Sequence, residues 1–127
     1  MTDDEGNRVL DITLTGTFRM TRAMLPHMEK RGRGAIVNNA SVLGWRAQKG
    51  QAHYAAAKAG VMALTRCSAV EAAEHGVGNN AVSPSIALHE VPKKASSEEL
   101  VAQLVFLASD YASYMTGEVL SVSSQHA

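Results

Sequence analysis

Apolar residues recur at helical spacing through the first thirty positions of the chain. They form two neighbouring stripes, Leu10, Leu14, Phe18 and Leu25 in one and Thr13, Thr17, Met20, Met24 and Met28 in the other. A capping threonine followed by acidic residues at positions 2–5 predicts that the helix begins there. It is expected to run to about Lys30, with a bend at Pro26. Two stripes indicate a broad buried face, so the second stripe is expected to meet a partner helix.

Three short and mostly apolar runs are typical of buried strands. They cover residues 35–39, 79–83 and 118–122. A long alanine-rich helix from His53 to Glu74 is expected between the first two strands. A shorter helix, started by a capping box at residues 96–99 and ending near Ser109, is expected between the last two. This alternation of helices and strands predicts a single α/β domain over residues 1–127, with a parallel sheet.

Composition and charge exclude several classes of function. The 127 residues carry 12 Lys and Arg against 12 Asp and Glu, which gives no indication of a nucleic-acid partner. No apolar run approaches the roughly 20 residues that span a bilayer, and no signal-peptide core occurs, so a cytoplasmic location is expected. The five histidines show no metal-ligand spacing, so no metal site is predicted. The single cysteine, Cys67, is expected to be a small buried side chain on the long helix.

Candidate chemistry is concentrated where the first predicted strand ends and the long helix begins. Ser41 follows the strand, while Tyr54 and Lys58, four residues apart, share one helix face. A free tyrosine has a pKa of about 10 and is a poor base, but a nearby cation stabilises its phenolate form, and Lys58 is the candidate cation. Tyr54 can then exchange a proton with an alcohol or ketone whose oxygen Ser41 hydrogen-bonds. An alcohol that gives up this proton must also lose a hydride, for which nicotinamide is the usual acceptor.

This stretch resembles the active-site segment of the short-chain dehydrogenase/reductase family. That family has a serine after its fifth strand and a Tyr-x-x-x-Lys motif thirteen residues later, which is the separation of Ser41 and Tyr54 here. The blocks at 38–41, 54–60 and 80–84 also fit the family, in the expected order. A Tyr-x-x-x-Lys pattern alone occurs on many helices, where it marks only a surface tyrosine and lysine, and the added serine and blocks make the signal specific.

The resemblance implies a Rossmann-like parallel sheet with flanking helices, of which this chain would hold strands five to seven. Strands one to four would precede Met1. The implied activity is an NAD- or NADP-dependent oxidoreductase that transfers a hydride between nicotinamide and an alcohol or ketone. Residues 39–48 resemble the branch acting on acyl thioesters of ring-degradation intermediates, and a generic β-ketoacyl-carrier reductase is the alternative within the family. The family also implies a homo-oligomer formed through the two long helices.

The same resemblance assigns roles to individual residues. Tyr54 would be the acid/base, Lys58 would stabilise its phenolate and hold the nicotinamide ribose, and Ser41 would orient the substrate oxygen. Contacts with the cofactor are expected from Tyr54, Lys58, Pro84 and Ser85.

Several departures from the family pattern concern the cofactor and the substrate. The sequence contains no glycine-rich turn of the kind that binds a dinucleotide, so a catalytically idle fragment or pairing module is the alternative function. Thr13 stands where the family has the asparagine of a proton relay and is expected to replace it. His89 stands in place of a threonine that contacts the nicotinamide amide. The substrate-covering segment at 92–107 is abbreviated, as if a piece were missing between about 100 and 105.

Two further residues are candidates for the pocket wall, and the predicted sheet has one unusual edge. His53 and Trp45 lie close to the motif in sequence. His53 is better explained as a surface or loop residue, and Trp45 is explained equally well as a loop aromatic that covers the core. Without strand four, the run at 35–39 becomes an edge strand that carries neither charge nor proline. Such an edge is a template for pairing, and the first helix loses part of the sheet it packs on, so its stripe of Met20, Met24 and Met28 is expected to stay exposed. The chain alone is therefore expected to self-associate or to fold poorly.

Overall fold

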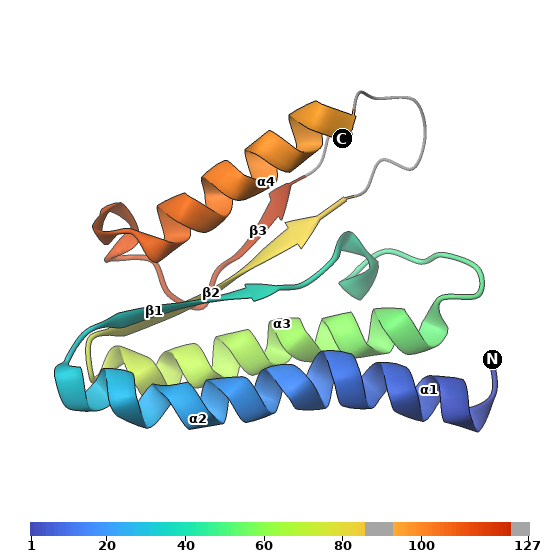
Figure 1. Cartoon of the computed structure of the whole chain (residues 1–127), viewed down its shortest axis with the longest axis horizontal. Coiled ribbons are helices and arrows are strands. Elements are labelled where there is room, and N and C mark those ends of the chain that lie inside the picture. Colours follow the sequence, from blue (N-terminus) through green and yellow to red (C-terminus); the bar gives the residue numbers. More distant parts are fainter. Residues whose placement is uncertain (86–92, 123–127) are drawn as a thin grey trace.

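Three parallel strands form one sheet with helices on both faces (Figure 1). Strand β1 (Gly34–Asn39) pairs with β2 (Val77–Pro84), which pairs with β3 (Val119–Val122), so the strand order is β1-β2-β3. The computed structural model describes residues 1–85 and 93–122, with only the backbone described at 93–97. The parallel α/β architecture confirms the predicted Rossmann-like fold class.

One long helical segment precedes β1. It consists of α1 (Asp3–Leu10), the π-helical turn η1 (Asp11–Thr15) and α2 (Gly16–Arg31). The capping expected at its start is present, because the Thr2 N–H donates to the Glu5 carboxylate at 2.7 Å and the Glu5 N–H donates to the Thr2 hydroxyl at 3.2 Å. Pro26 lies within α2, and the helix ends at Gly32, whose φ of 65° favours glycine.

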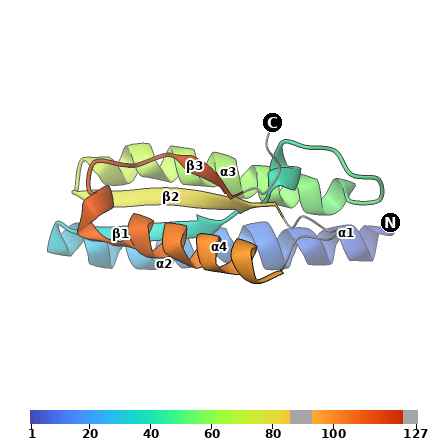
Figure 2. The ribbon, with the colours of Figure 1, turned by 90° about the horizontal axis from the view of Figure 1, so that it is seen from above.

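Helices α1, α2 and α3 (Ala52–Ala73) lie on one face of the sheet, while α4 (Lys93–Ala108) lies on the other (Figure 1). Seen from above, all of them run along the strands (Figure 2). The core is built on both faces of the sheet. One cluster contains Ala40, Val61, Met62 and Ala81, and the other contains Val82, Leu107 and Ala112. No helix in the described part of the chain is long and apolar enough to cross a membrane.

Much of the broad apolar face of the first helix is exposed, as expected for the Met20 and Met24 stripe of this chain alone, whereas the exposure of Phe18 in the other stripe was not expected. Thr21 is the one buried residue of α2, while Phe18, Met20 and Met24 expose 44%, 64% and 41% of their surface. The physical reason is that the helix lies beside the edge strand β1, which covers only one side of it. Leu14, by contrast, packs against the core. It lies so close to α3 that a Cβ added to Gly60 would be 2.7 Å from the Leu14 Cδ2 atom.

A buried polar network joins β1, β2 and α3. The Asn38 side-chain amide donates to the Thr65 hydroxyl at 2.9 Å and to the Asn79 side-chain oxygen Oδ1 at 3.3 Å. The Asn79 amide donates to the Ser68 hydroxyl at 2.6 Å, and Asn79 is fully buried. Because each side chain of this network finds a partner, it ties the end of β1 to the long helix.

Two local predictions are wrong. Helix α4 begins at Lys93, three residues before the expected capping serine Ser96, so residues 96–99 lie inside the helix. Cys67 is exposed, because the buried residues of α3 recur at helical spacing on another side of that helix. The remaining helices and strands begin and end within about two residues of their predicted positions.

Candidate active site

The carboxyl ends of β1 and β2 point toward the end of the molecule where α3 begins (Figure 1). The short 3-10 helix η2 (Val42–Gly44) follows β1 directly, and a loop then leads to α3. A cavity of about 280 Å³ lies between these segments. Its lining residues are Asn39, Ala40, Ser41, Val42, Leu43, Gln48, Tyr54, Pro84 and Leu100. In open parallel sheets the carboxyl ends of the strands are the usual place for a ligand.

Ser41 is placed in this cavity by the end of β1. It is buried and has extended backbone, and its hydroxyl oxygen accepts the Leu43 N–H at 3.3 Å, which caps η2. Because the oxygen serves as an acceptor in this bond, the hydroxyl proton stays available for donation to a ligand.

Tyr54 and Lys58 come from the first two turns of α3. Tyr54 is half-buried and lines the same cavity as Ser41. The Lys58 ammonium donates to the Asn39 carbonyl oxygen at 2.6 Å and lies 5.6 Å from the centroid of the Tyr54 ring. Burial lowers the pKa of Lys58 below its ordinary value. The lysine is therefore fixed between the end of β1 and the tyrosine.

The structure brings together some of the predicted site residues and not others. Ser41, Tyr54 and Pro84 line one cavity, and Lys58 lies beside it. Ser85 is buried, and its N–H donates to the Val122 carbonyl at 2.7 Å, but it does not line the cavity. His89 lies outside the described residues.

Thr13, the predicted relay residue, lies in the π-helical turn η1 and does not line the cavity either. Its carbonyl accepts the Thr17 hydroxyl at 2.7 Å. Trp45 is half exposed and does not line the cavity. His53 is partly buried, with its Nδ1 atom buried and without a hydrogen-bond partner among the described residues.

Two contributors to the site could not be found by sequence reasoning. The Asn39 carbonyl, which holds Lys58, is a backbone group and leaves no signature in the sequence. Leu100 reaches the cavity from α4, a helix that lies some sixty residues beyond Ser41 in the chain. Only the three-dimensional arrangement shows that this leucine faces the catalytic candidates.

Comparison with known proteins bears on the same residues. Residues 1–100 match the family model described as short chain dehydrogenase. The chain belongs to the short-chain dehydrogenase family. This finding confirms the resemblance predicted from Ser41, Tyr54 and Lys58.

Individual relatives agree with this assignment. The chain is 59% identical to the (5R,7aS)-5-hydroxy-7a-methyl-1-oxo-2,3,5,6,7,7a-hexahydro-1H-indene-carboxyl-CoA reductase of Mycobacterium tuberculosis, over 99% of this chain and 56% of that protein. It is 37% identical to the 3-oxoacyl-(acyl-carrier-protein) reductase FabG of Vibrio harveyi, over 97% of this chain and 58% of the relative. The crystal structure of a short chain dehydrogenase from Mycobacterium smegmatis matches with a TM-score of 0.88 and 63% identity, over 100% of this chain and 52% of that one.

The chain therefore spans about half the length of the relatives it matches. Its alignment with the M. tuberculosis reductase runs over 146 positions, more than the 127 residues of this chain. The relative therefore has residues inside the alignment that have no counterpart in this chain. The relative's printed name describes a coenzyme A thioester of a bicyclic ring compound. The predicted resemblance to the acyl-thioester branch of the family is thereby confirmed.

Proposed function

We propose that this chain carries the proton-transfer site of an NAD(P)-dependent oxidoreductase that interconverts a ketone and an alcohol on an acyl thioester. One observation supports this proposal above the others. Ser41 and Tyr54 line one cavity, and the Lys58 ammonium is fixed by the Asn39 carbonyl beside the tyrosine ring. A hydroxyl donor, a phenol and a cation are the groups that protonation of a carbonyl oxygen requires.

In the reduction direction, the Tyr54 hydroxyl gives its proton to the substrate oxygen as a hydride adds to the carbonyl carbon. The Ser41 hydroxyl donates a hydrogen bond to the same oxygen and fixes its position. Lys58 stabilises the phenolate that Tyr54 becomes, since its charge lies on the face of that ring. Thr13 would take part in a proton relay through water, from a position outside the lining of the cavity.

The bound nicotinamide would supply the hydride, and the residues present fit only the nicotinamide end of such a cofactor. One of the three Lys58 N–H groups is used by Asn39, so the other two can bind ribose hydroxyls. Pro84 lines the cavity where β2 ends, and Ser85 follows it. The glycine-rich turn that would bind the pyrophosphate does not occur in the 127 residues.

The substrate class is proposed from the relatives and the cavity together. The names of both reductases given above include an acyl carrier, coenzyme A in one and the acyl-carrier protein in the other. In this chain Leu43 and Leu100 give the cavity two apolar walls, which suit a ring or an acyl chain.

We also propose that the chain forms homo-oligomers through the outer surface of helices α2 and α3. Phe18 of α2 and Val70 of α3 expose 44% and 75% of their surface, and contact with a second copy would cover these apolar side chains.

Reduction of acetoacetyl-CoA and of a bicyclic ketone thioester, followed by the absorbance of NADH and NADPH, tests the proposal. Turnover that disappears in Tyr54→Phe is the expected result. Fluorescence titration of the chain with NADH and NADPH separates this function from the alternative of an idle fragment. A chain that shows neither saturable cofactor binding nor turnover would refute independent catalysis and support the alternative.

A further inference from the structure

The loop between η2 and α3 forms part of the rim of the candidate active site. Leu43 lines the cavity just before this loop, and Gln48 lines it from within the loop. Residues 45–50 therefore pass along the opening of the cavity, and the side chains of Arg46 and Lys49 are exposed there. A substrate too long for the cavity would leave it beside these two cations.

This part of the chain carries an excess of positive charge, although the whole chain is neutral. Residues 30–70 contain seven Lys and Arg and no Asp or Glu. In the described part of the chain, neighbouring elements do carry acidic side chains. Glu5 accepts the Thr2 N–H within its own capping box, and Glu98 and Glu99 are exposed on α4, which lies across the sheet. The loop itself therefore attracts anions.

Backbone bonds fix the start of the loop to the wall of the cavity. The N–H groups of Trp45 and Arg46 donate to the Val42 carbonyl at 3.1 Å and 2.8 Å, and Val42 lines the cavity. Trp45 exposes 50% of its surface, so part of its indole ring is open to contact with a flat ligand.

A tight turn fixes the end of the loop. The Gln51 N–H donates to the Gln48 carbonyl at 3.2 Å, and Gly50 has a φ of 79°, the left-handed conformation that such a turn favours in glycine. Lys49 lies within this turn. Its backbone is therefore ordered before any ligand binds, which lowers the entropy lost on binding.

Coenzyme A fits this arrangement of groups. A long pantetheine arm joins its acyl thioester to an adenine nucleotide that carries a diphosphate and one further phosphate. With the acyl group in the cavity, the arm would lead the nucleotide out past Gln48 to the loop. Arginine and lysine side chains both bind phosphate, and an adenine ring stacks on an indole ring.

We propose that residues 45–50 are a binding site for the nucleotide end of coenzyme A, in which Arg46 and Lys49 bind phosphate groups and Trp45 stacks on the adenine. This inference rests on the proposed function, since the acyl group must lie in the cavity for the nucleotide to reach the loop. It goes further by naming the residues that distinguish a coenzyme A thioester from a thioester without a nucleotide.

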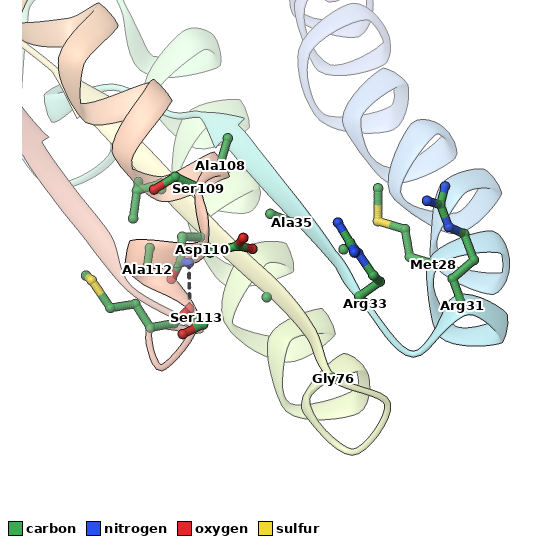
Figure 3. A pocket seen from close by; sticks show the side chains of 15 residues that line it. Met28, Arg31, Arg33, Ala35, Gly76, Ala108, Ser109, Asp110, Ala112 and Ser113 are labelled. Atoms are coloured by element: carbon green, nitrogen blue, oxygen red, sulfur yellow. Dashed lines mark hydrogen bonds between the residues drawn. The ribbon is translucent and has the colours of Figure 1, made fainter.

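A second pair of arginines does not offer the same match. Arg31 and Arg33 line another cavity, of about 400 Å³, at the amino ends of β1 and β2 (Figure 3). Asp110 lines that cavity too, so a phosphate bound there would meet a carboxylate. The loop at 45–50 instead follows the carboxyl end of β1, where the candidate active site lies. Arg33 is therefore a suitable control position for Arg46.

Trp45 is the one tryptophan of the chain, so tryptophan fluorescence reports on this loop. Coenzyme A, adenosine 3′,5′-bisphosphate and pantetheine are titrated into the full chain, and calorimetry repeats each titration. Coenzyme A and the bisphosphate should bind saturably, and pantetheine at least about tenfold more weakly than coenzyme A. Raising the salt concentration from about 0.05 M to about 0.5 M should weaken coenzyme A binding, because exposed charges are screened.

Matched variants locate the contact. Arg46→Gln and Lys49→Gln should each weaken coenzyme A binding about threefold to fivefold, which is typical of exposed charge pairs. Arg46→Lys keeps the charge and should recover most of the affinity. The controls Arg33→Gln and Lys30→Gln remove the same charges at exposed positions elsewhere and should change the affinity less than about 1.5-fold.

Four outcomes would overturn this nucleotide site. Three of them are the absence of saturable coenzyme A binding, pantetheine that binds as tightly as coenzyme A, and controls that weaken binding as much as Arg46→Gln and Lys49→Gln do. The fourth concerns NADPH, which also carries adenine and phosphates and is added to the complex. Displacement of coenzyme A by NADPH would assign the loop to the cofactor instead.

Failure of the proposed function gives a different result. Tyr54→Phe keeps residues 45–50, so it should bind coenzyme A like the wild type whether or not Tyr54 transfers a proton. Conversely, a chain that reduces acetoacetyl-CoA, but binds coenzyme A equally well with and without Lys49→Gln and Arg46→Gln, would keep the proposed reaction and lose the nucleotide site.

Discussion

Removing the Asn79 side chain should destabilise the chain by about 3 kcal/mol. Asn79 is fully buried, and Asn79→Ala deletes its hydrogen bonds with Ser68 and Asn38, each worth about 1 kcal/mol net. The change also leaves one N–H of the Asn38 amide buried without a partner, which costs about 1 kcal/mol more. A loss of this size is a large fraction of the roughly 5–15 kcal/mol that stabilises a typical domain.

Urea unfolding followed by far-ultraviolet circular dichroism measures this loss. With a slope of about 2 kcal/mol/M, the midpoint for Asn79→Ala should fall by about 1.5 M. Asn7→Ala, at an exposed position on α1, is the control and should stay within about 0.5 kcal/mol of the wild type. Each single change loses the shared bond between Asn38 and Asn79 and strands the partner group, and the double variant Asn38→Ala/Asn79→Ala loses that bond once and strands neither group, so it should cost about 3 kcal/mol less than the two single changes together.

Two results would refute this reasoning. One is an Asn79→Ala chain that unfolds within about 0.5 kcal/mol of the wild type, which would mean that the network contributes little to stability. The other is strict additivity in the double variant, since the Asn38 amide would then not depend on Asn79.

Three further predictions concern the site and the assembly. Tyr54→Phe should reduce any reductase activity about 10²–10⁴-fold with an unchanged circular dichroism spectrum, and wild-type turnover in the folded variant would contradict its role. Because burial lowers the pKa of Lys58, the unfolded chain binds more protons just below the ordinary value of 10.5, so stability should rise as the pH is raised through that window. Urea unfolding should show this rise in the wild type and not in Lys58→Met. Light scattering should detect self-association that Val70→Lys weakens, whereas a monodisperse wild-type monomer that melts cooperatively would show that the exposed helical face is no interface.

The helices and strands could be predicted because their signals are local. The Thr2 and Glu5 capping box, the apolar run at 35–39 and the alanine-rich helix each depend on residues within a few positions of one another. The start of α4 was not predictable in this way. A capping-box pattern at 96–99 fits a helix start, but it does not exclude a helix that already began at Lys93.

Burial could be predicted less well, because it depends on segments that are distant in the sequence. Phe18 belongs to the apolar stripe that was expected to lie on the sheet, yet 44% of its surface is exposed, because β1 is the outermost strand beside the helix in the described structure. Cys67 is of a type that is usually buried, but it lies on the outer side of α3. The same limit applies to the cavity, since Leu100 reaches it from a helix whose position no local pattern determines.

The proton-transfer candidates stay together in this chain because the segment that holds them is continuous. Asn39, Ser41, Tyr54 and Lys58 lie within twenty positions, and the bond from the Lys58 ammonium to the Asn39 carbonyl ties the start of α3 to the end of β1.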